Sequence, residues 1–369
     1  MYLILHAFSR RNSGDGLLVD LTLEVLQAAG IAPSDCILLA LDPESFHGDE
    51  IQVVPAPGEP SARLTPRLLR AGLSLGLHTV SSGRLGALSK LMGRASGMIA
   101  VGGGYLVADS AVRQSGVLVN HFAQLSGAAV SNVPTIYLPQ SIGPLQGPVG
   151  KLTRSKLAGL DRLYLRDDLS MEELNLPNTR RIGDLAVLKL AREIKSLKPL
   201  ASEKQTVLIA RELPRSSGYP DRLKVLAEQV DQPIWAVQAD TQGPRSDRAF
   251  YNRHGWQDQG AMSDLMAKGL AGTVISVRLH GAIAALLAGR PAIHLAYERK
   301  GWGAYQDLGI AEFVHDARDF DPGLVTAQAK ALNENPDAFW DRIRKAGPAL
   351  ERQYTEMVED LRERLNSQC

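Results

Sequence analysis

Short apolar runs alternate with helix-like segments along most of the chain. The runs with the length of buried strands are residues 2–6, 37–41, 51–54, 97–101, 134–139, 160–165, 206–210, 233–238, 274–277 and 292–296. The segments that we interpret as helices include residues 17–29, 112–128, 221–229, 262–268 and 281–288. Strands that alternate with helices build parallel sheets with right-handed crossovers, so the pattern predicts an α/β fold.

The chain has room for two domains, because its 369 residues can form two cores of ordinary size. The polar residues 191–204, which include Pro199, are the expected linker. We therefore expect Rossmann-like, doubly wound domains over residues 1–190 and 205–369, facing each other across a cleft. A long helix over residues 336–365 is expected to close the second domain.

The end of the predicted strand 274–277 carries the clearest candidate chemistry. Arg278, Leu279 and His280 follow it directly, and Gly281 removes side-chain bulk beside His280. Ligands of open α/β sheets bind outside the carboxyl ends of the strands. An Arg-x-His sequence at a strand end is also compatible with a purely structural role.

The next predicted strand, residues 292–296, ends in a second cationic group. Tyr297 is followed by Glu298, and then by Arg299 and Lys300. These cations and those of the preceding strand end are expected to face one crevice, which would be a pocket for a small anion with a proton donor inside it. Arg290, in the turn before this strand, is expected to be solvated.

Other predicted strands in the N-terminal half also end in polar or glycine-rich segments. Asn12, Ser13 and Asp15 stand where a helix begins, which suits either N-capping or contact with an anion or a sugar. The glycines of residues 102–104 would let backbone approach a ligand closely. Ser170 and Glu173 have the spacing of a capping box.

Charge and cysteine content narrow the class of protein. Lys and Arg number 41 and Asp and Glu number 40, so the net charge is +1 and does not predict binding to nucleic acid. An anion site must therefore be local.

Cys36 and Cys369 cannot form a disulfide framework, which favours a reducing, cytoplasmic setting. The histidines outside the strand-end cluster are scattered, so no metal site is expected.

Neither a signal peptide nor a membrane-spanning segment is expected. Residues 1–6 lack a basic region and a cleavage site, and no apolar run approaches the ~18 residues that cross a bilayer. Residues 64–80, with Arg67 and Arg70, predict an amphipathic basic helix. Such a helix packs on its own sheet or contacts an anionic membrane, which would place the protein at the inner face of the membrane.

The strand-end motifs, taken together, resemble a known family. They are Asn12-Ser13-Gly14-Asp15, Gly102-Gly103-Gly104-Tyr105, Ser141-Ile142-Gly143-Pro144, Leu165-Arg166-Asp167 with Ser170, and Arg278-Leu279-His280-Gly281 followed by Tyr297 and Lys300. Their order and spacing, from near the N-terminus to about Leu308, are similar to those of the polysaccharide pyruvyl transferases. One departure is Asp184-Leu185-Ala186, where the family usually has Asp-Pro-Ala, and this leaves the role of Asp184 open.

The resemblance implies a GT-B-like fold and a specific activity. The family moves the carboxyvinyl group of phosphoenolpyruvate onto two hydroxyls of one sugar, which forms a cyclic pyruvate ketal and releases phosphate. Phosphoenolpyruvate is then a co-substrate, no cofactor or metal is needed, and the acceptor is a polymeric or lipid-linked sugar. The acceptor's identity and the oligomeric state stay open.

The resemblance also implies roles for individual residues. Arg166, Arg278, Leu279 and His280 would form the donor site, with His280 as the catalytic acid and Arg278 beside it. The strand-end motifs add Gly103, Gly104, Ser141 and Lys300 as donor-binding candidates, and Asn12, Asp15 and Tyr105 as acceptor-binding candidates. Arginine suits the carboxylate and phosphate of the donor, and histidine can be protonated near neutral pH. Contacts from Arg166 and Arg278 would put the donor between the two domains.

Two other functions fit the same scaffold. A nucleotide-sugar glycosyltransferase would need an acidic residue for the donor ribose, and Glu298 and Asp307 are available. A carbohydrate-binding protein without enzymatic activity would need no proton donor.

Overall fold

The computed structural model describes residues 1–57, 83–197, 205–213, 218–230, 233–239, 246–269 and 272–366. The side chains of residues 83–85 and of Arg299 are not part of this description. The expected basic helix over residues 64–80, the second half of the expected linker and Cys369 lie outside the described residues. No helix in the described part of the chain is both long enough and apolar enough to span a bilayer.

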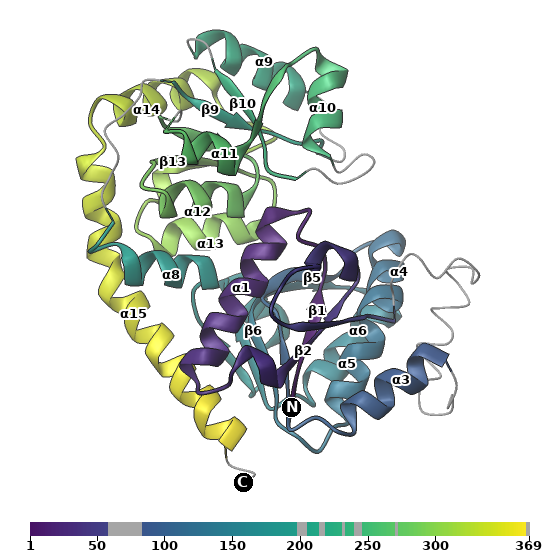
Figure 1. The fold of residues 1–369 in the computed structure, drawn as a ribbon. Coiled ribbons are helices and arrows are strands. Elements are labelled where there is room, and N and C mark those ends of the chain that lie inside the picture. The colour runs from purple at the N-terminus through teal and green to yellow at the C-terminus, as the bar shows by residue number, and fades with distance from the viewer. Residues whose placement is uncertain are drawn as a thin grey trace. The chain divides into compact units, whose positions relative to one another are not determined.

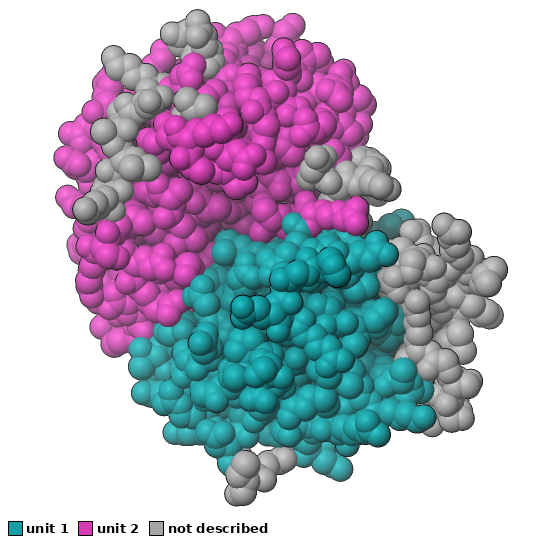
Figure 2. Space-filling model, viewed as in Figure 1, with its two compact units in different colours: residues 1–10, 15–185, 354–369 teal, residues 11–14, 186–353 magenta. Residues whose placement is uncertain are grey.

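The chain forms two compact α/β units, which Figure 2 distinguishes by colour. Unit 1 comprises residues 1–10, 15–185 and 354–369, and unit 2 comprises residues 11–14 and 186–353. Figure 1 labels their helices and strands.

Unit 1 is built on a parallel sheet of eight strands. These are β1 (Tyr2–Ala7), β2 (Cys36–Ala40), β3 (Gln52–Pro55), β4 (Gly97–Ala100), β5 (Gly103–Ala108), β6 (Thr135–Leu145), β7 (Arg162–Leu165) and β8 (Thr179–Arg181). Their order is β3-β2-β1-β4-β6-β7-β8, and β5 pairs with β6 off this path. The described helices are α1 (Ser13–Ala28), α3 (Gly83–Met92), α4 (Ala111–Asn120), α5 (Phe122–Ala129), α6 (Gly147–Leu157) and α7 (Asp168–Leu174).

Helices cover both faces of this sheet. Leu3 and Leu5 point into a core cluster with residues of α3, α4, α5 and α6. Ile4, between them, has no exposed surface either, although successive side chains of a strand point to opposite faces. Burial on both faces explains why the strands are nearly continuous apolar runs.

Unit 2 contains a six-stranded parallel sheet. Its strands are β9 (Val207–Ile209), β10 (Ile234–Val237), β11 (Asp258–Ala261), β12 (Val274–Ser276), β13 (Ala292–Ala296) and β14 (Val314–Asp316). The order β11-β10-β9-β12-β13-β14 is the 3-2-1-4-5-6 order of a Rossmann sheet. Connections reverse direction between β9 and β12, and Ile275 pairs with Leu208 there. Such a switch point is where ligands of this fold bind.

The helices that belong to unit 2 follow its strands in alternation. They are α9 (Tyr219–Gln229), α10 (Asp247–His254), α11 (Met262–Ala267), α12 (Leu279–Leu287), α13 (Arg299–Asp307) and α14 (Pro322–Glu334). Three helices contain a boundary between the units: α1, whose first two residues group with unit 2, and the helices α8 (Leu185–Glu193) and α15 (Asp337–Asn366). The long helix expected over residues 336–365 is present as α15.

The units differ from the expected domain bounds at their ends. The last residues of the chain group with unit 1 because Asp360 of α15 accepts hydrogen bonds from Arg162 at 3.0 Å and from the Tyr164 hydroxyl at 2.5 Å. The unit boundary falls after Leu185, at the start of α8, so the first part of the expected linker is helical.

Three local predictions were wrong. Residues 112–128 form two helices, α4 and α5, which meet at His121. Gly103 and Gly104 begin strand β5, so the glycine segment is not only a strand-end loop, and β6 continues past Gln140 beside it. The N-cap of α7 is Asp167, whose side chain accepts from the Ser170 amide at 2.8 Å.

Candidate functional site

Arg278 lies at the carboxyl end of β12 and is the N-cap residue of α12. Its guanidinium binds the carboxylate of Asp247, from Nε to Oδ1 at 2.9 Å and from Nη2 to Oδ1 at 2.5 Å. Arg278 is 9% exposed and Asp247 is fully buried. Burial lowers the pKa of Arg278, but the Asp247 carboxylate outweighs this effect and raises the pKa above its ordinary value. Arg278 is thus a fixed cation in unit 2.

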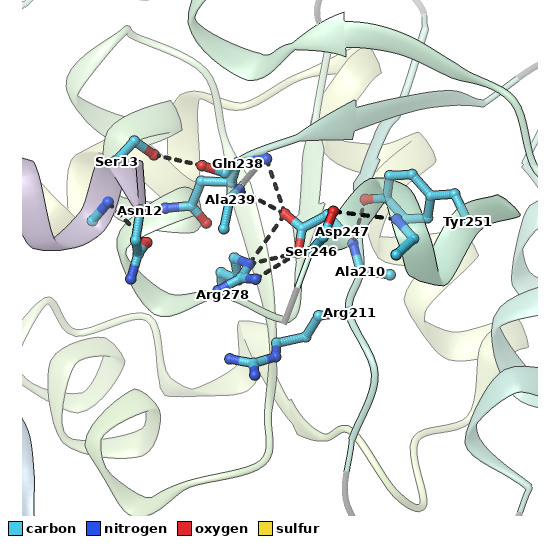
Figure 3. A network of polar contacts seen from close by, with 12 residues as sticks. Asn12, Ser13, Ala210, Arg211, Gln238, Ala239, Ser246, Asp247, Tyr251 and Arg278 are labelled. Atoms are coloured by element: carbon cyan, nitrogen blue, oxygen red, sulfur yellow. Dashed lines mark hydrogen bonds and ion pairs between the residues drawn. The ribbon is translucent and has the colours of Figure 1, made fainter. Parts of the chain in front are cut away.

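Asp247 also holds the chain that follows β10. Its Oδ2 accepts from the amides of Gln238 at 3.0 Å and Ala239 at 2.9 Å (Figure 3). Ser246 caps the helix that carries Asp247 by accepting from the Ala249 amide. One carboxylate therefore ties together the ends of β10 and β12 and the start of α10.

His280 is half-buried in the first turn of α12. Gly14, which groups with unit 2, lies against its ring: a Cβ on Gly14 would be 2.9 Å from His280 Cβ and 3.0 Å from Nδ1. Asn12 forms an antiparallel bridge with Ala239, and the Ser13 hydroxyl donates to the Gln238 carbonyl at 3.0 Å. The segment of residues 11–14 is therefore part of the surroundings of His280.

Gly281 was expected to make room for the His280 side chain, but it makes room for other residues. A Cβ at this position would lie 2.6 Å from Oε1 of Gln238 and 2.9 Å from the Ser276 hydroxyl. The glycine makes room for Gln238 and Ser276, whereas Gly14 makes room for the His280 ring. The neighbouring Leu279 is buried at the first position of α12.

The second cationic group lies at the end of β13. Lys300, in the first turn of α13, forms an ion pair with Glu298 at 2.8 Å. His294 of β13 is buried beside it, and its Nδ1 lies 2.8 Å from the Ser276 carbonyl oxygen. Burial lowers the pKa of His294 to about 4. Arg290 is 3% exposed and donates to the Gly269 carbonyl, so the expectation of a solvated side chain was wrong.

Arg166 is the predicted donor residue of unit 1, and it lies at the carboxyl end of β7. The side chain is 1% exposed, donates from Nε to the Ser141 hydroxyl at 3.0 Å and forms an ion pair with Asp184. This pair gives Asp184 the role that the sequence left open. The direct contact of Arg166 with a donor stays a prediction.

Tyr105 belongs to a buried polar cluster at the same edge of the unit 1 sheet. Its hydroxyl accepts from Gln140 at 2.7 Å, and its ring lies 4.6 Å from that of His121 and 5.0 Å from that of His6. Burial, and secondarily His121, holds the pKa of His6 well below its ordinary value, and burial lowers that of His121 to about 3. The expectation that these two histidines are scattered was wrong, because they lie next to each other. Gly104 is exposed beside them, and Gly103 is buried.

The other acceptor candidate, Asp15, stands in the first turn of α1 and belongs to unit 1. Asn12 accepts from the Gly14 amide at 3.3 Å. Nowhere in the described ranges do three or more His, Cys, Asp or Glu side chains gather as they would around a metal ion.

Residues 12–299 match the family described as polysaccharide pyruvyl transferase. The chain belongs to this family. The matched range contains the ends of β7, β12 and β13 described above, so the resemblance and its enzyme class are confirmed at the level of the family.

One curated relative shares a short stretch of sequence with this chain. The amylovoran biosynthesis protein AmsJ of Erwinia amylovora is 29% identical over 72 residues, which are 20% of this chain and 17% of that protein. The chain thus matches well under two thirds of that relative's length.

Solved structures share the fold of this chain. UDP-GlcNAc 2-epimerase from Neisseria meningitidis, solved with UDP-GlcNAc, has a TM-score of 0.57 and 12% identity, over 98% of this chain and 99% of that one. The UDP-GlcNAc 2-epimerase of Methanocaldococcus jannaschii has a TM-score of 0.52 and 12% identity, over 96% and 100%. At this identity the likeness concerns the fold alone, and it confirms the GT-B-like class.

Two residues at this edge of the unit 2 sheet are not among the candidates that the sequence suggests. Asp247 gave only the signal of a helix start, because Ser246 precedes it. Arg211 directly follows the predicted strand 206–210, so the strand-end rule that selected Arg278 would also have selected it. In the structure, Arg211 follows β9 at the switch point of the unit 2 sheet.

Proposed function

We propose that this pyruvyl transferase moves the carboxyvinyl group of phosphoenolpyruvate onto two hydroxyls of one sugar in a glycan. The observation that carries the proposal is the arrangement at the end of β12, where an arginine held by Asp247 and a half-buried histidine begin the same helix. A fixed cation suits the donor's anionic groups, and the adjacent imidazole suits proton transfer.

In the proposed reaction His280 donates a proton to the methylene carbon of phosphoenolpyruvate. The carbon that bears the phosphate becomes electrophilic, and one sugar hydroxyl attacks it and returns its proton to the imidazole. The C–O bond to phosphate breaks, and the second hydroxyl adds to the same carbon. Its proton leaves with phosphate, so the products are a methyl-bearing ketal and hydrogen phosphate.

Other residues would hold the donor during these steps. Arg278 and Lys300 are the proposed cationic contacts in unit 2, and Leu279 would pack beside them. Arg166 and Ser141 are the proposed contacts in unit 1, together with the backbone of Gly103 and Gly104. Asn12, Asp15 and Tyr105 are the proposed contacts of the sugar, which is polymeric or lipid-linked.

The test is incubation of the purified protein with a glycan acceptor and either phosphoenolpyruvate or a panel of nucleotide sugars. Phosphate release with a ketal in the product supports the proposal, whereas transfer from a nucleotide sugar would support the glycosyltransferase alternative. Acceptor binding without any turnover would indicate a glycan-binding protein.

The role of His280 can be tested separately. Replacing an acid catalyst costs ~10²–10⁴-fold in rate, so His280→Gln and His280→Ala should both be slow while donor affinity falls far less. His47→Gln is the control, because His47 is exposed and belongs to unit 1. A His280→Gln variant as fast as wild type would assign the acid to another residue.

A further inference from the structure

The switch point of the unit 2 sheet contains a second arginine, Arg211, with a different kind of partner from Arg278. Arg211 follows β9 and Arg278 follows β12, and these two strands are neighbours in the sheet. The carboxyl ends of neighbouring parallel strands meet at one edge, and ligands of doubly wound sheets bind at such a point. Figure 3 draws both arginines.

Arg211 is bound to a neutral group instead of a carboxylate. Its Nη1 donates to the Tyr297 hydroxyl at 3.2 Å, and its guanidinium carbon lies 5.6 Å from the centre of the Tyr297 ring. The ring and the hydroxyl hold the guanidinium in place without neutralising its charge. The next residue, Glu212, forms its ion pair with Arg253.

The Nε edge of Arg211 has no partner in the part of the chain that the structure describes. Nε is buried and donates no hydrogen bond to any described residue, which costs free energy unless a ligand or water accepts from it. Arg278 uses the corresponding edge, Nε and Nη2, to bind the carboxylate of Asp247. A carboxylate or phosphate fits the same edge of Arg211 in the same way.

The surrounding charges favour an anion at Arg211. The charge of Arg278 is balanced by Asp247, and Lys300 is paired with Glu298. Arg211 therefore supplies positive charge at this edge that none of these carboxylates cancels.

We infer that Arg211, held by Tyr297, binds the carboxylate or phosphate of the small anionic substrate at the switch point of unit 2. The inference rests on the proposed function for the identity of that substrate, phosphoenolpyruvate. It adds an anion-binding residue that the strand-end motifs do not contain.

The experiment is calorimetric titration of the full chain with phosphoenolpyruvate, inorganic phosphate and pyruvate. For Arg211→Gln we expect the dissociation constant of phosphoenolpyruvate to rise at least roughly tenfold, since charge-assisted hydrogen bonds are lost. Whichever of phosphate and pyruvate loses more affinity identifies the group that Arg211 binds. Arg253→Gln is the matched control, because Arg253 is exposed and pairs with Glu212, and it should bind like wild type.

Tyr297→Phe tests the same contact without removing the charge. It deletes the hydroxyl that positions Nη1, so we expect a smaller loss of affinity than for Arg211→Gln, with tryptophan fluorescence reporting that unit 2 is folded. Equal dissociation constants for Arg211→Gln, Arg253→Gln and wild type would overturn the inference and leave the donor proposal intact. Arg211-dependent binding of phosphate without binding of phosphoenolpyruvate would support the inference and contradict the donor proposal. If wild type binds none of the three anions, both are wrong.

Discussion

The carboxylate of Asp247 and the guanidinium of Arg278 form a buried pair across 31 residues of sequence. Nε of Arg278 contacts both carboxylate oxygens, at 2.9 and 3.1 Å, and Nη2 contacts Oδ1 at 2.5 Å. The same carboxylate accepts two backbone amides after β10. The pair therefore positions Arg278 and also stabilises the edge of the sheet that carries His280.

Asp247→Asn should strongly destabilise unit 2. The variant leaves Arg278 without its counter-charge in a buried place, which typically costs ~3–5 kcal/mol of unfolding free energy. The four tryptophans, Trp235, Trp256, Trp302 and Trp340, all belong to unit 2, so urea unfolding followed by tryptophan fluorescence reports this unit.

The control for this prediction is Asp319→Asn in the same unit. Asp319 pairs with Arg222 at 2.6 Å, but its side chain is 80% exposed. Exposed pairs contribute ~0–1 kcal/mol, so its unfolding should resemble wild type. Similar losses in both variants would contradict the structural role of Asp247.

Asp184→Asn should have a comparable effect in unit 1. Asp184 is the buried partner of Arg166, and its loss leaves that guanidinium uncompensated, at a cost of ~3–5 kcal/mol. Because unit 1 contains no tryptophan, fluorescence does not report its unfolding, and hydrogen exchange of the β6 and β7 amides is the measurement. Asp168→Asn is the matched control, because Asp168 is 69% exposed in its pair with Arg181. Unchanged protection of β7 in Asp184→Asn would show that Arg166 does not need this partner.

Gly14→Ala should impair turnover through His280. The added methyl would lie 2.9 Å from His280 Cβ, so the ring must move, and a displacement of about 1 Å in a catalytic group can cost ~10²-fold in rate. Donor affinity should change much less, and the His280 ring resonances should shift. Gly116→Ala is the control: nothing lies within 4 Å of its added Cβ in α4, and alanine favours a helix by up to ~1 kcal/mol. Unshifted His280 resonances in Gly14→Ala would refute the contact.

Acid should destabilise unit 2 through His294. Its pKa is about 4 in the folded protein, below the ordinary value of 6.5, because burial disfavours the charged ring. As the pH falls below 6.5 the unfolded chain binds a proton that the folded chain does not bind until about pH 4. Stability that is fully present above pH 6.5 is thus lost on acidification, by ~1.4 kcal/mol per pH unit within this window.

The measurement is urea unfolding by tryptophan fluorescence between pH 7.5 and 5. His294→Asn keeps a donor for the Ser276 carbonyl but cannot be protonated, so its stability should depend less on pH than that of wild type. His6 and His121 belong to unit 1 and do not enter this signal. Equal pH dependence in His294→Asn and wild type would assign the effect to other groups.

Much of the fold could be predicted from the sequence because its signals are local. The apolar run at residues 292–296 coincides with β13, and residues 2–6 and 274–277 differ from β1 and β12 by one residue. Alternation of such runs with helices determines the parallel α/β class wherever the strands come to lie. The family was likewise identifiable from residue types at their spacing, since Arg278 and His280 keep their neighbours in any fold.

Strand order and burial, by contrast, were decided only by the tertiary structure. Asp247 became the partner of Arg278, and Asp184 that of Arg166, because separate strand ends meet at one edge of a sheet. Arg290 is buried although it stands in a turn, and His6 meets His121 although 115 residues separate them. The spacing of apolar residues along a helix or strand predicts which of its faces is buried. The partner of a polar side chain depends instead on which elements pack beside it. That packing depends on the whole chain, so it cannot be predicted from the residue at any single position.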